Sequence, residues 1–260
     1  MANTNGGIIG VVNIPTQQNG PTTSFTSSGT YTASPTASTV NYLIAAGGGS
    51  GGGADEISGA GGAGGLLNGT SPVSGGSSYP VTVGGGGSSS SWNSISTTGG
   101  GAGGPTRNTS GSPGGSGGGA GDFSGSGGSG VPGQGNSGGD ASGETVGCGG
   151  GKTSAAVSNP TGLVGDGLDS SISGSPVVYS RGGGAGSART GPSSTPSGGG
   201  TVQPGPGATF ANRGYGGNTS LSGGSGVVII QEIGNGPFLA SGVWNLKTQF
   251  QYRKAANWPS

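Results

Sequence analysis

Histidine is absent from the sequence, and cysteine occurs only once, at Cys148. The usual zinc ligand sets and a Ser–His–Asp catalytic triad are therefore excluded, and a single cysteine cannot form an internal disulfide. Carboxylate side chains are few and scattered, so no pair of them suggests general acid–base catalysis. We expect no catalytic residue, no metal site, no cofactor and no enzymatic activity.

Charged residues are also scarce, at 6% of 260 residues, with eight Lys and Arg balancing eight Asp and Glu. A nucleic-acid-binding protein needs a basic surface, so nucleic acid is not an expected partner. No run of 18 apolar residues is present, which argues against insertion into a membrane. The first residues contain neither a basic segment nor a long apolar stretch, and we expect no secretory signal.

Hydrophobic residues make up only 27% of the chain, whereas glycine alone contributes 71 residues. Globular domains are nearly half apolar, so a conventional core cannot be filled. Low hydrophobicity usually indicates disorder, but disordered chains also tend to carry a high net charge, and this chain is formally neutral. We therefore expect an ordered structure that is held together by something other than a large apolar core.

The distribution of glycine divides the chain into three zones. Residues 1–46 contain five glycines, residues 47–226 contain 63 and residues 227–260 contain three. We interpret 1–46 as an N-terminal β or attachment region and 47–226 as a glycine-rich domain with variable loops. Residues 227–260 form a closing strand followed by an aromatic and basic cap.

Both edges of the glycine-rich zone have the pattern of β-strands. Val40, Tyr42 and Ile44 alternate along 39–46, and a second apolar strand lies at 226–233. Because each is too short to be stable alone, we expect the two to pair in one sheet that closes the domain. Residues 25–31 are predicted to form a hairpin with its turn at Ser28-Gly29, and a further apolar run extends from Ile8 to Ile14.

Dense glycine runs such as 47–53, 84–87, 99–104 and 114–121 lack the strict triplet period of collagen. They favour polyglycine II helices, which have three residues per turn and no internal hydrogen bonds. Their N–H and C=O groups point sideways and pair with neighbouring helices, and only a residue without Cβ permits that close approach. The predicted fold class is mostly irregular and β: a polyglycine II sandwich closed by a small β-sheet.

The segments between the glycine runs do not resemble one another, and we expect recognition to reside in them. Aromatic and arginine side chains dominate the energetics of binding interfaces. The candidate receptor-binding residues on these loops are Tyr79, Trp92, Arg107 and Phe123. For Trp92 two interpretations are open, a receptor contact or a plug beneath the loop layer.

The C-terminal zone is the most conventional part of the sequence, with one short helix expected after Asn245. It is either an amphipathic cap with a solvated basic face or a docking segment for another protein. The candidate docking residues are Trp244, Phe250, Tyr252, Arg253, Lys254 and Trp258.

Two motifs are weak. Residues 147–153 match part of a phosphate-binding loop, but Val146 occupies the position of its first glycine, and no strand–helix pattern surrounds it. Asp166 and Asp169 suggest a calcium loop of the repeat type, but no second copy follows at a fixed period. Neither motif supports a bound nucleotide or metal.

The chain resembles the glycine-rich adhesins of phage tail fibres. The resemblance rests on the strand that enters glycine at 39–53, on residues 177–186 and on the exit strand at 223–232. It is similar to the distal adhesins of T-even phages, and residues 241–260 resemble the ending of glycine-rich virion proteins of aquatic and cyanobacterial phages. The N-terminal zone matches no T-even attachment domain.

This resemblance implies a virion-surface protein, on a tail fibre or another appendage, that is assembled in the host cytoplasm; otherwise the protein is extracellular. It implies loops that bind a host receptor, either a glycan or an outer-membrane protein, together with other virion proteins as partners. A homo-oligomer (a trimer or filament) and a monomer on a fibre tip both remain open. The alternatives are a purely structural self-assembling fibre, sheath or decoration subunit, and an ice-binding protein, against which the irregular loops argue.

Overall fold

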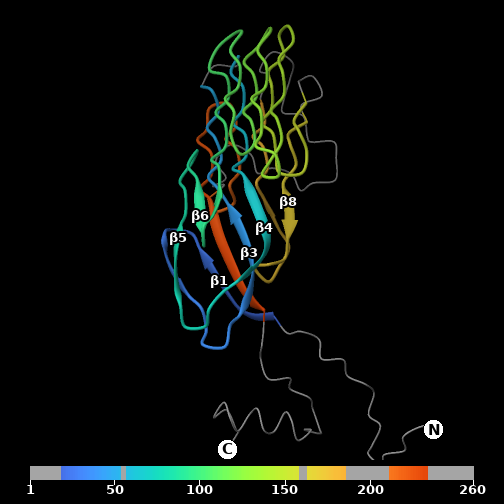
Figure 1. Ribbon diagram of the computed structural model, residues 1–260. Helices are drawn as coiled ribbons and strands as arrows, with labels where there is room; N and C mark the ends of the chain where they lie inside the picture. Colours follow the sequence, from blue (N-terminus) through green and yellow to red (C-terminus); the bar gives the residue numbers. More distant parts are fainter. Residues whose placement is uncertain (1–18, 54–56, 158–162, 186–210, 234–260) are drawn as a thin grey trace, which may run out of the picture.

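The structure is a computed structural model that describes residues 19–53, 57–157, 163–185 and 211–233. These residues are mostly β and irregular, and no helix occurs among them. Two parts follow each other along the long axis in Figure 1: strands gather at one end, and long irregular runs extend from them toward a layer of loops. The expected apolar run 8–14 and the C-terminal cap lie outside the described residues.

The β end contains three antiparallel sheets. Sheet A has the strand order β1–β10–β3–β4, sheet B has the order β2–β5–β6–β7, and β8 pairs with β9. The strands are β1 (Asn19–Phe25), β2 (Gly29–Thr32), β3 (Thr39–Ala45), β4 (Leu66–Pro72), β5 (Ser78–Thr82), β6 (Ser90–Trp92), β7 (Ile95–Thr97), β8 (Leu168–Ser170), β9 (Val177–Tyr179) and β10 (Val227–Ile233).

The two strands that bracket the glycine-rich zone form the centre of sheet A. β3 and β10 pair antiparallel, with Ala45 opposite Val227 and Val40 opposite Glu232. β3 leads directly into the first glycine run at Ala46, and β10 follows the last run from Gly226. The prediction that the segments 39–46 and 226–233 share one sheet is therefore confirmed.

The predicted hairpin at 25–31 is wrong. The chain does turn after Phe25, but β1 pairs with β10 in sheet A while β2 pairs with β5 in sheet B. The turn at Ser28 thus carries the chain from one sheet to the other. Apolar burial explains this choice, because Phe25 and Tyr31 both pack on the cluster between the two sheets.

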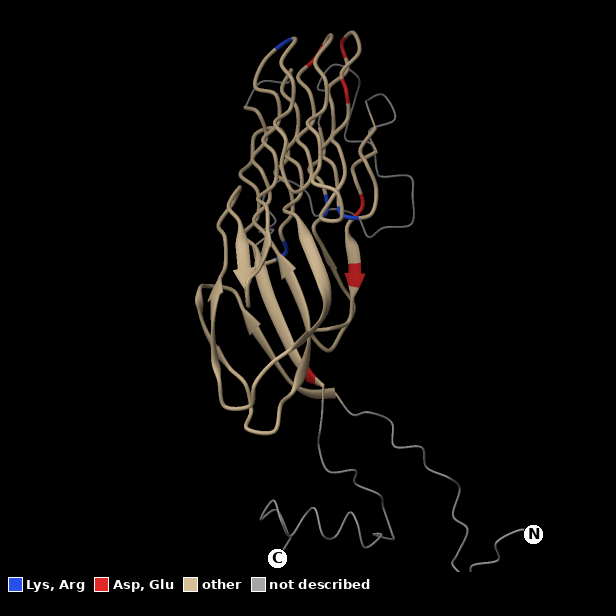
Figure 2. Cartoon of the chain, viewed as in Figure 1, with Lys and Arg blue, Asp and Glu red and all other residues tan. Residues whose placement is uncertain are grey.

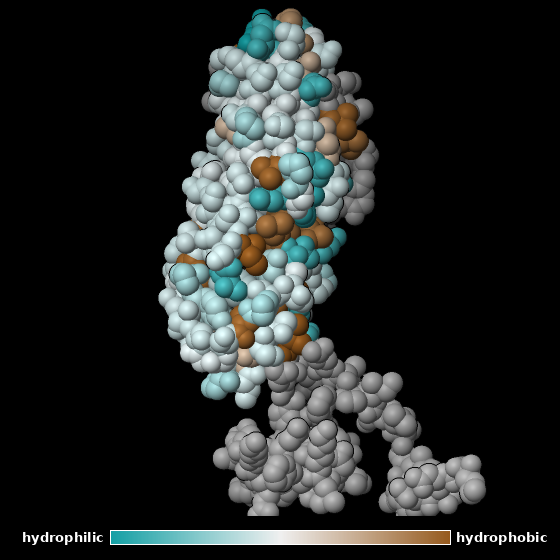
Figure 3. All heavy atoms as spheres, in the orientation of Figure 1, coloured by the Kyte–Doolittle hydropathy of each residue, from teal (hydrophilic) through white to brown (hydrophobic). Residues whose placement is uncertain are grey.

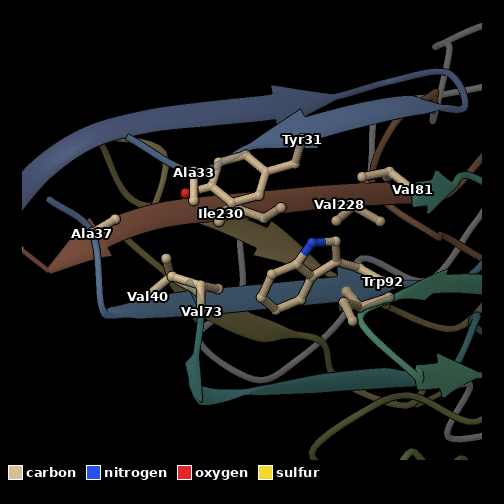
Figure 4. Close-up of a cluster of buried hydrophobic side chains, with 10 residues drawn as sticks. Tyr31, Ala33, Ala37, Val40, Val73, Val81, Trp92, Val228 and Ile230 are labelled. Atoms are coloured by element: carbon tan, nitrogen blue, oxygen red, sulfur yellow. The ribbon is translucent and has the colours of Figure 1, made fainter. Parts of the chain in front are cut away.

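Sheets A and B enclose the main apolar cluster of the molecule. Figure 4 shows Tyr31 and Trp92 lying beside Val40, Val228 and Ile230 of sheet A. On the other face of sheet A, a second cluster packs against the β8–β9 hairpin, whose Leu168 and Val177 are partly buried. Its buried members are Leu43, Ala45, Leu66, Tyr179, Val227 and Ile229. Most of the large apolar residues that the structure describes are therefore concentrated at the β end.

A buried carboxylate joins the two sheets. Oε1 of Glu232 accepts hydrogen bonds from the Tyr31 hydroxyl at 2.8 Å and from the Ser34 main-chain N–H at 2.9 Å. Burial alone would raise the pKa of Glu232, but the bonds from Ser34 and Tyr31 outweigh it and hold that pKa below its ordinary value. Burial, followed by the bond to Glu232, raises the pKa of Tyr31.

Beyond the sheets, the glycine-rich runs are joined side by side by main-chain hydrogen bonds. The run 58–65, which is fully buried, donates to three neighbouring segments in strict rotation. The bonds, donor first, are Gly59 to Gly104, Ala60 to Gly147, Gly61 to Gly217, Gly62 to Gly101, Ala63 to Gly150, Gly64 to Gly214 and Gly65 to Thr98. Every third amide therefore points in the same direction.

The carbonyl groups of the same run follow the same rule toward three other segments. Gly59, Gly62 and Gly65 accept from Gly52, Gly49 and Ala46, whereas Ala60 and Ala63 accept from Gly119 and Ser116, and Gly61 accepts from Gly183. The central run 58–65 is thus surrounded by six segments, and each contact is a main-chain hydrogen bond of 2.8–3.1 Å.

These close approaches exclude a Cβ atom at most positions of the central run. A methyl group at Gly59, Gly61 or Gly64 would overlap with a carbonyl oxygen of a neighbouring run. Two positions of the run are nevertheless alanine, and both Ala60 and Ala63 are fully buried. They lie three residues apart, so their methyl groups share one side of the run.

We expect Gly62→Ala to destabilise the protein by about 2–4 kcal/mol, because the new methyl group overlaps with the carbonyl oxygens of Ser116 and Gly117. The matched control is Gly85→Ala, since a Cβ at Gly85 has no atom within 4 Å; its effect should stay within about 0.5 kcal/mol. Chemical unfolding measures both variants. Equal losses of stability would contradict the close packing of the runs.

Glu232→Gln tests the link between the sheets. A carboxylate with a lowered pKa stabilises the fold above the pKa it has in the unfolded chain, near 4.5, and loses this effect as the pH falls through its folded value. We expect the variant to be about 1 kcal/mol less stable than the wild type at pH 7. The difference should shrink below pH 4.5, as measured by unfolding at pH 7 and pH 3. A difference in stability between variant and wild type that is the same at both pH values would contradict a stabilising role of the Glu232 carboxylate.

Candidate functional site

The end of the bundle opposite the sheets carries a layer of loops. The described loops are 105–110, which follows the run 98–104, then 122–125 and 142–145. Figure 2 shows both acidic and basic positions at this end and again where the glycine runs meet the sheets, with almost no charge along the runs between. The loop layer therefore holds side-chain chemistry that the bundle lacks.

Arg107, Asp122 and Phe123 meet in this layer. The guanidinium group of Arg107 lies over the ring of Phe123, 4.7 Å from its centroid, within the range of a cation–π interaction. Its Nε is 3.4 Å from Oδ2 of Asp122. The side chain of Arg107 is 50% exposed, whereas that of Asp122 is 5% exposed. A buried carboxylate and an exposed ring thus hold one arginine between them.

Hydrogen bonds lock the loops that supply these residues to each other. The N–H of Asn108 donates to the carbonyl of Asp122 at 2.8 Å, and the Ser124 hydroxyl donates to Oδ1 of Asn108 at 2.9 Å. The N–H of Asp122 donates in turn to the carbonyl of Ile57. The site is therefore preformed by contacts between loops rather than within one of them.

Phe123 is held in an unusual conformation. Its φ is 74°, a region that costs a residue other than glycine on the order of 1–3 kcal/mol. A bridge to Gly143 maintains it, because each residue donates its N–H to the carbonyl of the other. Phe123 is nevertheless 38% exposed. The strained backbone thus presents the Phe123 side chain to solvent, and this side chain contributes little to any apolar core.

Two of the four predicted receptor-binding residues do not lie in this layer. Trp92 is 1% exposed and packs edge-on to Tyr31 at 6.1 Å between ring centroids. Tyr79 stacks on Tyr31, and its hydroxyl accepts the N–H of Ser74 at 2.7 Å. Both belong to the β end, and for Trp92 the receptor interpretation is wrong. Its large apolar surface fills the core between the sheets, as Figure 4 shows.

The sequence reasoning missed Asp122 as a site residue. A detectable signal was present, because Asp122 precedes the candidate Phe123 and is one of very few charges between the glycine runs. Oδ1 of Asp122 is buried and has no hydrogen-bond partner among the described residues. The six docking candidates from Trp244 to Trp258 lie outside the described residues, so their role stays a prediction.

The remaining reactive groups are tied to the scaffold. Cys148 is fully buried, and burial raises the pKa of its thiol. Lys152, in the partial phosphate-binding motif, donates from Nζ to the carbonyl of Gly133 at 2.6 Å. Among the described residues, no group of three or more His, Cys, Asp and Glu side chains is placed to hold a metal ion.

A comparison with protein families finds a match to the model of the glycine-rich domain over residues 22–232. The chain belongs to this glycine-rich domain family. The matched segment begins in β1 and ends in β10, so the family unit includes the closing sheet as well as the glycine runs.

No curated protein and no solved structure matches the chain. In the part of the chain that the structure describes, no helix is long and apolar enough to cross a membrane. The family match supports the glycine-rich character of the chain and says nothing about what it binds.

Proposed function

We propose that the glycine-rich region is a polyglycine II sandwich. A polyglycine II helix has three residues per turn and makes its hydrogen bonds to its neighbours. The rotation of the amide donors of 58–65 among three segments, and of its carbonyl acceptors among three others, is the pattern that such a helix requires. The exclusion of Cβ atoms at Gly59, Gly61 and Gly64 supports the same assignment.

We further propose that this sandwich is a display scaffold with opposite poles. Asn19 and Ile233, the first and last residues that the structure describes, are paired partners, so both lie at one pole. The loops 105–110, 122–125 and 142–145 lie at the other (Figure 1). A protein attached to a larger particle through residues near its ends would point these loops outward.

From this polarity we infer that the protein is an adhesin: a phage tail-fibre or virion-surface protein whose loops bind a host receptor. The observation that carries the proposal is the exposed, preformed pair Arg107–Phe123 at the pole remote from Asn19 and Ile233 (Figure 1). Preorganised arginine and aromatic side chains are typical of recognition surfaces. The proposal includes assembly with other virion proteins, and it includes no catalysis, nucleic-acid binding or membrane insertion.

The visible surface of the molecule supports a display role more than a filament role. Figure 3 shows a mainly white to teal surface, with apolar groups in small patches rather than one broad face. Subunits that bury large surfaces against copies of themselves usually carry extended apolar contacts. We therefore rank the self-assembling structural subunit below the adhesin.

Binding of labelled protein to a panel of bacterial cells tests the adhesin proposal. The tip variant combines Arg107→Ser, Phe123→Gly and Glu144→Ser, all at exposed positions of the loop layer. The control combines Thr23→Ala, Thr30→Ala and Thr70→Ala, which are exposed on the β end. We expect the tip variant to lose cell binding and the control to keep it. Equal binding by both variants, or binding to no cell by the wild type, would favour the structural subunit.

A further inference from the structure

Arg107 carries two Nη groups whose hydrogen-bond donors the described residues leave unused. Its Nε faces Asp122 at 3.4 Å and its plane lies over Phe123. No hydrogen bond joins its two Nη groups to any described residue, and half of the side chain is exposed. A planar guanidinium held by Nε on one side and by an aromatic ring on one face keeps the pair of Nη donors in a fixed orientation.

The chemistry of such an edge is specific. Two parallel N–H donors match the two oxygens of a carboxylate or phosphate, and this bidentate pairing is stronger than a neutral hydrogen bond. The exposed ring of Phe123 beside it offers an apolar surface for the C–H groups of a sugar. We propose that Arg107 and Phe123 form a subsite for an acidic sugar, one that bears a carboxylate or a phosphate, on a surface glycan. This inference rests on the adhesin function proposed above.

The charges around the subsite limit what it accepts. The three described tip loops carry Arg107 together with Asp122 and Glu144, and Asp140 lies just before the third loop, so carboxylates outnumber the one cation in these segments. Long-range attraction of a dense polyanion is therefore absent, and binding depends on the short bidentate contact. We expect a single acidic sugar in a glycan to be accepted and nucleic acid to be rejected, with only a weak dependence of affinity on salt.

Because of the backbone conformation of Phe123, the stability of the Phe123→Gly variant distinguishes a binding role of the ring from a structural one. At a φ of 74°, glycine is more stable than phenylalanine unless the ring itself contributes packing. Phe123→Gly should therefore leave the melting temperature unchanged or raise it while removing the apolar surface of the subsite. If the ring were a cap on the bundle, the same change would lower the melting temperature.

The test measures binding of the purified full chain to three immobilised polysaccharides. The first contains glucuronate, the second is the same polymer after reduction of its carboxyl groups to alcohols, and the third is a neutral polymer that carries phosphate. We expect binding to the first or third, and no binding to the reduced polymer. Binding to the first identifies the carboxylate as the ligand group, and binding to the third identifies the phosphate.

Three variants complete the test. Arg107→Lys keeps the charge but loses the bidentate edge, and Phe123→Gly loses the ring; each should weaken binding at least about tenfold. Val157→Ala removes the other large apolar side chain that is exposed among the described residues, and it should bind like the wild type. Binding by Arg107→Lys at wild-type strength, binding to the reduced polymer, or a lower melting temperature of Phe123→Gly would overturn the subsite.

The cell assay separates this inference from the adhesin function. If the tip variant loses cell binding while Arg107→Lys keeps it, the loops bind a receptor by other contacts, and only the acidic-sugar subsite is wrong. Cell binding that protease treatment of the cells abolishes, and that reduction of their carboxyl groups leaves unchanged, would identify a protein receptor and likewise overturn the subsite. If the tip and control variants bind cells equally, the adhesin function fails, and the polysaccharide assay still decides what Arg107 binds.

Discussion

The structure depends on one constraint: main chains can pair on all sides only where no Cβ atom keeps them apart. In the central run 58–65 the amide groups of residues 59–65 and six of the eight carbonyl groups pair with six neighbouring segments. Each bond contributes only about 1 kcal/mol net, while fixing each residue costs about 1–2 kcal/mol in backbone entropy. An isolated run therefore cannot hold its shape, and the bundle becomes stable only as a whole that the two β-sheets close.

This constraint explains where the other residue types lie. Most of the large apolar side chains that the structure describes lie at the β end rather than among the runs, and Trp92, Ile44 and Val228 form a small core there. Charged and aromatic side chains that belong neither to the β end nor to the packed runs are found in the loops where the runs reverse direction. Arg107 and Phe123 occupy such reversals, where their side chains do not disturb the bundle.

The sequence predicted the features that depend on local pattern and composition. The alternation along 39–46 and the apolar strand at 226–233 predicted their pairing, because no other segment offered a comparable partner. The hairpin at 25–31 was wrong, since the partners of β1 and β2 are chosen by contacts with β10 and β5, about 200 and 50 residues away. The contact between Arg107 and Phe123 was equally invisible, because it depends on how two loops 16 residues apart are brought together. Trp92 is buried because it packs against Tyr31 and Tyr79. The spacing of these residues in the sequence does not reveal that contact.

Hydrogen exchange of individual amides, followed by NMR, tests the central claim most directly. The account predicts that the amides of residues 59–65 all exchange slowly, at rates set by unfolding of the whole domain, because each donates to a neighbouring run. The amide of Gly85, an exposed residue outside the packed runs, should exchange far faster. Exchange of 59–65 at the rates of a flexible glycine–serine linker would show that the runs are not joined, and the scaffold account would be wrong.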